Sequence, residues 1–265
     1  MIPEKQVGFI HHLLRMDEYE QAHMEIDRLD LRLLDEKWQD SLIFLKGWTA
    51  YWQKELDTAI EYLLKSDTSD HFYEQSRFYA AICASNKGAY QQSDSILAGA
   101  VLQKPLHQEL VIFQKAGNAL LRNELKKYDS LKTGFSDHFY ALQEPQTEMN
   151  ALAGEIEAFK PRSKFLAAAL SAIIPGLGKI YAGKTGEGVS AFLITGMLGG
   201  LTAENLVKDG VKDWKTILAG SIFTTYYIGN IWGSYFAVQM KREEFYGQIQ
   251  QQLLINMHIP LRTVF

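Results

Sequence analysis

The feature that most constrains this chain is the uneven distribution of its charged residues. Residues 1–164 carry 44 charged side chains, whereas residues 165–240 carry nine in 76 positions. Residues 216–240 contain no charge at all. A soluble helix of that length would normally show a polar face, so the pattern predicts two regions built for two different solvents. We expect an all-α chain in which an N-terminal helical domain is followed by a transmembrane helical domain.

The first region contains an internal repeat. Leu56, Tyr90 and Leu125 begin equivalent segments 34 and 35 residues apart, and Tyr19 begins an earlier copy 37 residues upstream. Three further sets occupy equivalent positions: Phe44, Phe78 and Phe113; Gly47, Ala81 and Ala116; Ala50, Ala84 and Ala119. Small residues three apart on a helix let a neighbouring helix approach closely. The pattern resembles the tetratricopeptide repeat, a helix–turn–helix unit, and predicts a repeat domain over residues 1–135.

Stacked helical repeats form a concave surface that suits a peptide or a partner helix. Position in the repeat predicts that mostly aromatic side chains face it: Phe44, Trp48, Tyr51, Phe78, Ile82, Phe113 and Leu120. In the other interpretation these side chains fill the core between repeats, which we favour for Phe78 and Phe113. A protein partner bound through the repeats is therefore expected.

Residues 136–164 form a connector. Apolar residues recur in it at helical spacing, at Met149, Leu152, Ile156 and Phe159. This stripe predicts an amphipathic helix after a break at residues 134–145, and the helix either caps the repeats or lies on a membrane surface. Lys160, Arg162 and Lys164 follow just before the apolar region, as basic residues do at a membrane surface.

The apolar region, residues 165–240, divides into three predicted spans at about residues 165–182, 187–205 and 215–240. Glycines four apart predict close helix contacts at Gly196, Gly200, Gly229 and Gly233. Asn230 is predicted to hydrogen-bond between helices, since an amide in lipid needs a partner. The tail, residues 241–265, is expected to leave the membrane as an amphipathic helix carrying Phe245, Ile249 and Leu253, and to end in an extended segment from Ile259 to Leu261.

A glycine-rich stretch joins the first two predicted spans. Residues 178–185 match the phosphate-loop pattern G-x-x-x-x-G-K-[ST]. That loop requires a strand before it and a helix after it, whereas residues 165–174 are alanine-rich and helical in pattern. We therefore interpret the match as coincidence and expect neither nucleotide binding nor an enzyme.

The same stretch supports a different interpretation. Its key residues are Pro175, Gly176, Gly178, Lys179, Tyr181, Gly183 and Lys184. With Ser171, they resemble a segment found in small two-helix bacterial membrane domains and in gram-negative envelope proteins that join helical repeats to such a domain. The resemblance implies an integral protein of a bacterial membrane, expected to be the inner membrane, with lysines and tyrosine at the lipid interface. Residues 1–8 lack the pattern of a signal peptide, which leaves the side of the repeats open.

Several classes of function are not expected. The net charge is −4 with no basic stripe, which argues against nucleic-acid binding. The single cysteine, Cys83, excludes an intramolecular disulfide and a cysteine-built zinc site. No set of residues suggests catalysis, a metal or a cofactor. The leading hypothesis is a membrane-anchored adaptor that binds a partner protein. The alternative is a membrane domain that itself handles lipid or a small solute, with the repeats as a regulatory module.

Overall fold

The computed structural model describes residues 3–29 and 36–265. Within these ranges every regular element is a helix and no strand occurs, which confirms the all-α class. Predictions that concern residues 1–2 and 30–35 fall outside the described residues.

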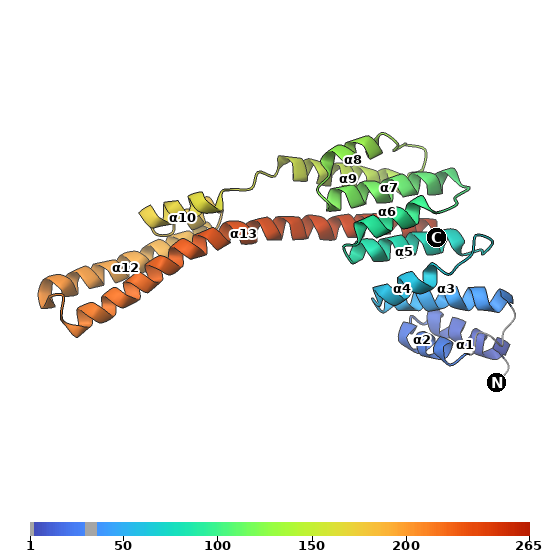
Figure 1. Ribbon diagram of the computed structural model, residues 1–265, viewed down its shortest axis with the longest axis horizontal. Coiled ribbons are helices and arrows are strands. Elements are labelled where there is room, and N and C mark those ends of the chain that lie inside the picture. Colours follow the sequence, from blue (N-terminus) through green and yellow to red (C-terminus); the bar gives the residue numbers. More distant parts are fainter. Residues whose placement is uncertain (1–2, 30–35) are drawn as a thin grey trace. The chain divides into compact units, whose positions relative to one another are not determined.

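The helices fall into two groups (Figure 1). The first group is α1 (Pro3–Arg15), α2 (Tyr19–Asp27), α3 (Glu36–Trp52), α4 (Leu56–Leu63), α5 (Tyr73–Asn86), α6 (Tyr90–Ala98), α7 (Pro105–Leu121), α8 (Leu125–Lys132) and α9 (Tyr140–Ala158). The second is α10 (Lys164–Ile173), α11 (Leu177–Tyr181), α12 (Thr185–Asp209) and α13 (Trp214–Val264). The chain forms two compact units: unit 1 is Met1–Glu157 with Gln250–Phe265, and unit 2 is Ala158–Ile249.

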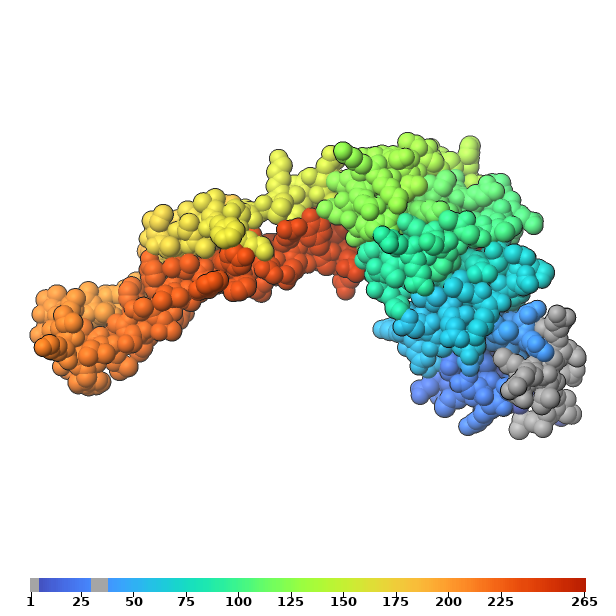
Figure 2. Space-filling model, in the orientation of Figure 1, coloured from blue at the N-terminus to red at the C-terminus, as the bar shows by residue number. Residues whose placement is uncertain are grey.

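In unit 1, the helices from α1 to α8 pack as successive pairs. Figure 2 shows the pairs following one another in chain order, from dark blue through cyan to green. A residue with positive φ ends the first helix of each pair: Asp17, Lys54, Gly88 and Asn123. The amide that follows it donates to a carbonyl five residues earlier, as from Glu55 to Ala50 at 2.9 Å. This bond closes the helix end and reverses the chain.

Small residues let the two helices of a pair approach closely, as their spacing predicts. A Cβ atom added to Gly47 would lie 2.7 Å from Cγ of Leu63 on the neighbouring helix. Ala50, Ala84 and Ala119 are fully buried. The large side chains that surround these contacts form the core of unit 1.

Helix α9 packs in unit 1 through the stripe that the sequence predicts. Met149, Leu152 and Ile156 are buried, and the Tyr128 hydroxyl donates to Oδ1 of Asn150 at 2.7 Å. The helix begins at Tyr140, so the predicted break extends too far. Pro145 lies in the second turn, where the missing amide removes only one helical hydrogen bond. The apolar stripe of α9 is therefore buried within unit 1.

In unit 2, the first predicted span is interrupted. Helix α10 has ten residues, about 15 Å of helix, and ends before Pro175. Gly176, with φ of +85°, then reverses the chain into α11. The segment predicted as the first span, about residues 165–182, therefore consists of two short helices, because proline cannot continue the hydrogen bonding of α10.

Among the described residues, one helix is long and apolar enough to cross a membrane, α12. The predicted span at residues 215–240 lies in α13, which is long enough but less apolar. Its uncharged stretch includes serine, threonine, tyrosine, asparagine and glutamine side chains, which lower its hydropathy. The absence of charge therefore overstated how apolar this segment is.

Candidate functional site

The inner groove of unit 1 is occupied by the end of the chain itself. We use "inner groove" for the surface formed by Tyr51 of α3, Phe78 of α5, and Gln114 and Gly117 of α7, and "tail helix" for residues 250–265 of α13. Leu253, Met257 and Leu261, spaced four residues apart on the tail helix, are almost completely buried in unit 1. The prediction of an extended Ile259–Leu261 segment is wrong, because α13 continues through Pro260 to Val264.

Three polar contacts accompany the apolar stripe of the tail helix. The Tyr51 hydroxyl lies 2.5 Å from Nε2 of His258 and hydrogen-bonds with it. The side chain of Gln114 donates to the carbonyl of Met257 at 2.6 Å. On the other side, the Asn256 amide donates to the carbonyl of Pro145 in α9 at 2.8 Å. These directional contacts set the register of the tail helix in the groove.

Gly117 is the point of closest approach between α7 and the tail helix. A Cβ atom placed there would lie 2.4 Å from the sulfur of Met257. A larger residue at this position would therefore force the side chain of Met257 to shift. At the end of the tail helix, the ring of Phe265 lies 5.5 Å from Phe78 and 4.9 Å from His107, between ring centroids.

The residues predicted to face the groove separate into two classes. Phe44, Phe78, Ile82 and Phe113 are buried in the core of unit 1. Trp48 and Tyr51 are only partly buried and belong to a cluster of aromatic rings with Tyr79, whose ring centroid lies 4.7 Å from that of Trp48. Phe78 also reaches the tail helix, so the core and the groove share it. The interpretation as core therefore applies most fully to Phe44 and Phe113.

Burial shifts the pKa values of the titratable side chains in and near the inner groove. It raises the pKa of the Tyr51 hydroxyl well above its ordinary value, and raises the pKa of Tyr79 and of the Cys83 thiol to about 12. Burial, together with the positive charge of Arg262, lowers the pKa of His258. The contact between Tyr51 and His258 is therefore one between neutral groups near pH 7. A buried, protonated thiol is also a poor nucleophile.

Sequence reasoning missed the occupant of the groove, although its signal was present. The spacing of Phe245, Ile249 and Leu253 predicts an amphipathic helix, and the same four-residue spacing continues to Met257 and Leu261. Pro260 hid this continuation, because proline usually ends a helix. Gln114 and Gly117 carried no such signal, since neither residue type is characteristic of a groove.

The glycine-rich stretch is a site of tight packing in unit 2. A Cβ atom on Gly178 would lie 1.9 Å from the carbonyl oxygen of Ala167, and one on Gly176 would lie 2.0 Å from that of Gly188. The amide of Gly178 donates to the Ser171 hydroxyl at 3.0 Å, and that hydroxyl lies 2.6 Å from the one of Ser234. These contacts join α10, α11, α12 and α13.

The remaining members of the stretch lie around this packing. Lys179 runs along α13, with Cε 3.4 Å from the Cβ position of Gly233. The Tyr181 hydroxyl accepts a hydrogen bond from the amide of Ser163 at 3.3 Å. Gly183 has φ of +89° and ends the turn, and Lys184 forms an ion pair with Glu187 at 3.4 Å.

The glycines predicted to bring helices together are mostly not the ones that do so. Added Cβ atoms at Gly196, Gly200 and Gly229 would meet no neighbouring atom within 4 Å. Close approach between α12 and α13 occurs instead at Gly199, where an added Cβ atom would lie 3.1 Å from the ring of Phe223. Asn230 is buried, but neither polar atom of its amide has a hydrogen-bond partner among the described residues. The predicted bond between helices is therefore not formed.

Comparison of the chain with protein-family models, with curated proteins and with solved structures gives no match. In the described part of the chain, no group of three or more histidine, cysteine, aspartate or glutamate side chains could hold a metal ion. The geometry of the two units is therefore the basis for assigning a function.

Proposed function

We propose that this chain is a membrane-anchored helical-repeat adaptor whose inner groove binds an amphipathic helix of a partner protein at a bacterial envelope membrane. The observation that carries the proposal is the tail helix in the groove. It buries an apolar stripe and is held by polar side chains at Tyr51 and Gln114. An amphipathic helix in an apolar groove is a recurring mode of peptide recognition.

The arrangement of α1–α8 supports an array of tetratricopeptide-like repeats. The four residues with positive φ, Asp17, Lys54, Gly88 and Asn123, recur at intervals of 37, 34 and 35 residues. These are the intervals of the sequence repeat, so each turn occupies the same place in its unit. Arrays of this kind present one continuous inner surface built from the first helix of each pair.

The surface of unit 2 supports a place in a membrane, which we propose to be the bacterial inner membrane. Large apolar side chains lie exposed on every long helix of the unit, among them Phe165, Ile173, Met197, Val207 and Trp232. Soluble proteins rarely expose apolar surface on this scale. Lipid would cover it, with α12 as the span best supported by length and composition.

A partner helix would use the contacts that the tail helix now makes. It would place apolar side chains at positions equivalent to Leu253, Met257 and Leu261 and a hydrogen-bonding group opposite Tyr51. The tail helix competes as part of the same chain, at a high effective concentration. The adaptor therefore opens only for a partner that binds tightly or after the tail helix is released.

The proposal assigns no catalysis, cofactor or nucleotide to the chain. In a phosphate loop, backbone amides point at the phosphates. Here the amides of Lys179 and Ile180 both donate to the carbonyl of Gly176 at 3.1 Å, and Lys184 is paired with Glu187. These donors are already used within unit 2, which supports the interpretation of the motif match as coincidence.

The groove is tested with a labelled peptide of residues 247–265 and the full chain in detergent. A chain with Leu253→Asp and Leu261→Asp should release its tail helix and bind the peptide at least about tenfold more tightly than the unaltered chain, whose groove is filled. The matched control carries Ile255→Asp and Ile259→Asp on the exposed face of the same helix and should behave as the unaltered chain.

Two results would contradict the adaptor. If the released chain keeps its helical circular dichroism and binds no peptide, the groove is not an acceptor for helices. If the released chain unfolds, the tail helix is a permanent part of the core. The membrane part fails separately, if alkaline carbonate without detergent extracts the intact chain from membranes.

A further inference from the structure

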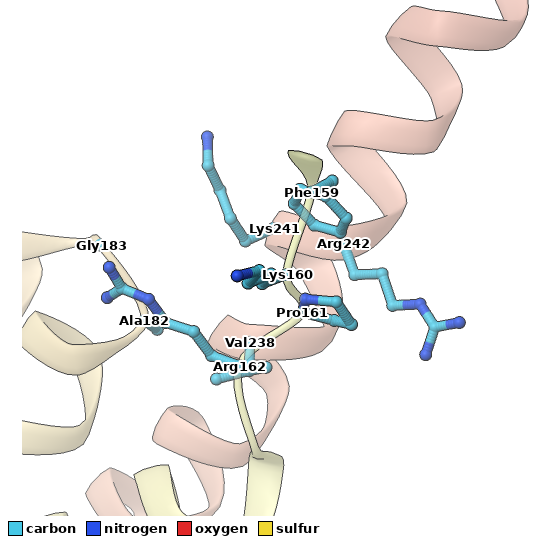
Figure 3. A pocket seen from close by; sticks show the side chains of 9 residues that line it. All are labelled: Phe159, Lys160, Pro161, Arg162, Ala182, Gly183, Val238, Lys241 and Arg242. Carbon is cyan, nitrogen blue, oxygen red and sulfur yellow. The ribbon is translucent and has the colours of Figure 1, made fainter. Parts of the chain in front are cut away.

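Unit 2 contains a cavity of about 280 Å³ whose lining is basic (Figure 3). Its walls are residues 159–162 of the connector, the turn at Ala182 and Gly183, and residues Val238, Lys241 and Arg242 of α13. Four of these lining residues are cationic and none is acidic. The cavity is distinct from the inner groove, since all of its residues belong to unit 2.

The connector is fixed against both of its neighbours. The ring of Phe159 stacks on that of Phe245 in α13, with centroids 3.9 Å apart. The amide of Ser163 donates to the hydroxyl of Tyr181, and the Arg162 guanidinium lies 5.3 Å from the centre of the same ring. The basic side chains between these two points therefore project from a positioned segment of backbone.

The positive charge of the cavity is largely uncompensated. Within the described ranges, Lys160, Arg162 and Arg242 form no ion pair, and Lys241 pairs with the exposed Glu244 at 3.5 Å. Like charges gathered in one cavity repel each other, and a bound anion relieves that repulsion. In Figure 3, Arg162 extends toward Gly183 and Arg242 points the other way, so Arg162 and Lys160 are the better placed pair.

The cavity also has an apolar side. Val238 and Ala182 are almost completely buried and belong to the small apolar core of unit 2. Phe165, three residues after Arg162, and Phe236, five residues before Lys241, are exposed. A ligand that fits both surfaces has an anionic head and an apolar body.

We propose that this cavity binds a phosphate group, and that its ligand is the headgroup of an anionic phospholipid. The Arg162 guanidinium offers a planar fork that suits two phosphate oxygens, and Lys160 and Lys241 add single charges. The lipid source rests on the membrane placement in the proposed function. The phosphate chemistry does not, because a soluble phosphate could meet the same donors.

The test uses native mass spectrometry of the full chain in a neutral detergent. Short-chain phosphatidylglycerol, phosphatidylcholine and inorganic phosphate are added separately, and bound fractions are measured. We expect saturable binding of phosphatidylglycerol that Lys160→Gln with Arg162→Gln weakens by about tenfold or more. The matched control, Lys212→Gln with Lys215→Gln, removes two exposed lysines, one in the turn before α13 and one in its first turn, and should leave binding unchanged.

Each ligand separates one source from another. Saturable inorganic phosphate binding that depends on Arg162 supports the phosphate site with a soluble ligand. Binding of phosphatidylglycerol in the absence of inorganic phosphate binding supports the lipid headgroup as the ligand. Equal uptake of both lipids, insensitive to the Lys160 and Arg162 changes in variants that keep their helical circular dichroism, would overturn the proposal. The peptide test of the inner groove is independent of all these outcomes.

Discussion

Unit 1 and unit 2 place their large apolar side chains in opposite ways. Unit 1 buries them, with Phe78, Phe113 and Leu253 almost inaccessible. The core cluster of unit 2 consists of three alanines and a valine, while side chains as large as Trp232 and Phe165 lie exposed. The hydrophobic effect therefore assembles unit 1 in water. Lipid, which we propose surrounds unit 2, gives no such drive, so unit 2 would depend on close packing and on hydrogen bonds.

The largest effect that this comparison predicts is at the glycines of unit 2. Gly178→Ala would force Cβ against the backbone of Ala167, which cannot move as a flexible side chain does. Gly176→Ala would cause a similar overlap with the carbonyl of Gly188, and alanine would also be strained at the positive φ of this position. We expect each change to destabilise unit 2 by roughly 3 kcal/mol, seen as loss of protease resistance in detergent.

The control for this prediction lies in the same unit. Gly196→Ala meets no atom within 4 Å and lies inside α12, so it should raise helix stability by about 0.5–1 kcal/mol. If Gly178→Ala is tolerated as well as Gly196→Ala, close packing of the turn does not hold unit 2 together, and the contrast with unit 1 loses its main support.

The sequence predicted this contrast better than it predicted the sites. Charge distribution indicated two environments, and the repeat positions of Gly47 and Ala50 predicted close helix pairs, because both signals depend on local composition and spacing. The prediction of close helix contacts at Gly196 and Gly200 was wrong, since spacing alone does not say which face of a helix meets a neighbour. The tail helix was missed for a different reason: its contacts with Tyr51 and Gln114 join residues more than a hundred positions apart.

The two units also differ in the hydrogen bonding of their buried amide side chains, and this difference predicts an effect of intermediate size on stability. In unit 1, Asn118 accepts from the Ser85 hydroxyl at 2.7 Å and donates to Ser93 and Asp94 at 2.9 Å. In unit 2, the amide of Asn230 has no partner within the part of the chain that the structure describes. A buried polar group is costly when unpaired, so the two residues should respond in opposite ways to an apolar replacement.

We expect Asn118→Ala to destabilise unit 1 by about 2 kcal/mol, because it removes the hydrogen bonds to Ser85, Ser93 and Asp94 and leaves a space in the core. Asn230→Leu should be neutral or stabilise unit 2 by about 1 kcal/mol, since it removes a buried amide that bonds to none of the described residues. Hydrogen exchange of α5–α7 and of α13 in the full chain measures both. A loss of protection in α13 after Asn230→Leu would show that this amide has a partner in the membrane.

The smallest effect should be a dependence of the tail helix of unit 1 on pH. Burial and Arg262 lower the pKa of His258, so the released histidine binds a proton more readily than the docked one. The stabilisation is complete above the ordinary histidine pKa of about 6.5 and is lost as the pH falls toward the lowered value. Protonation also leaves Nε2 able only to donate to the Tyr51 hydroxyl, whichever group donates in the neutral pair. Exchange protection of residues 250–265 should therefore weaken as the pH falls from about 7.5 to about 5.5.

The variant His258→Gln does not titrate at this position, so its exchange protection should not change over the same pH range. A pH dependence that persists in His258→Gln would come from another group and would leave His258 as a packing residue of the groove.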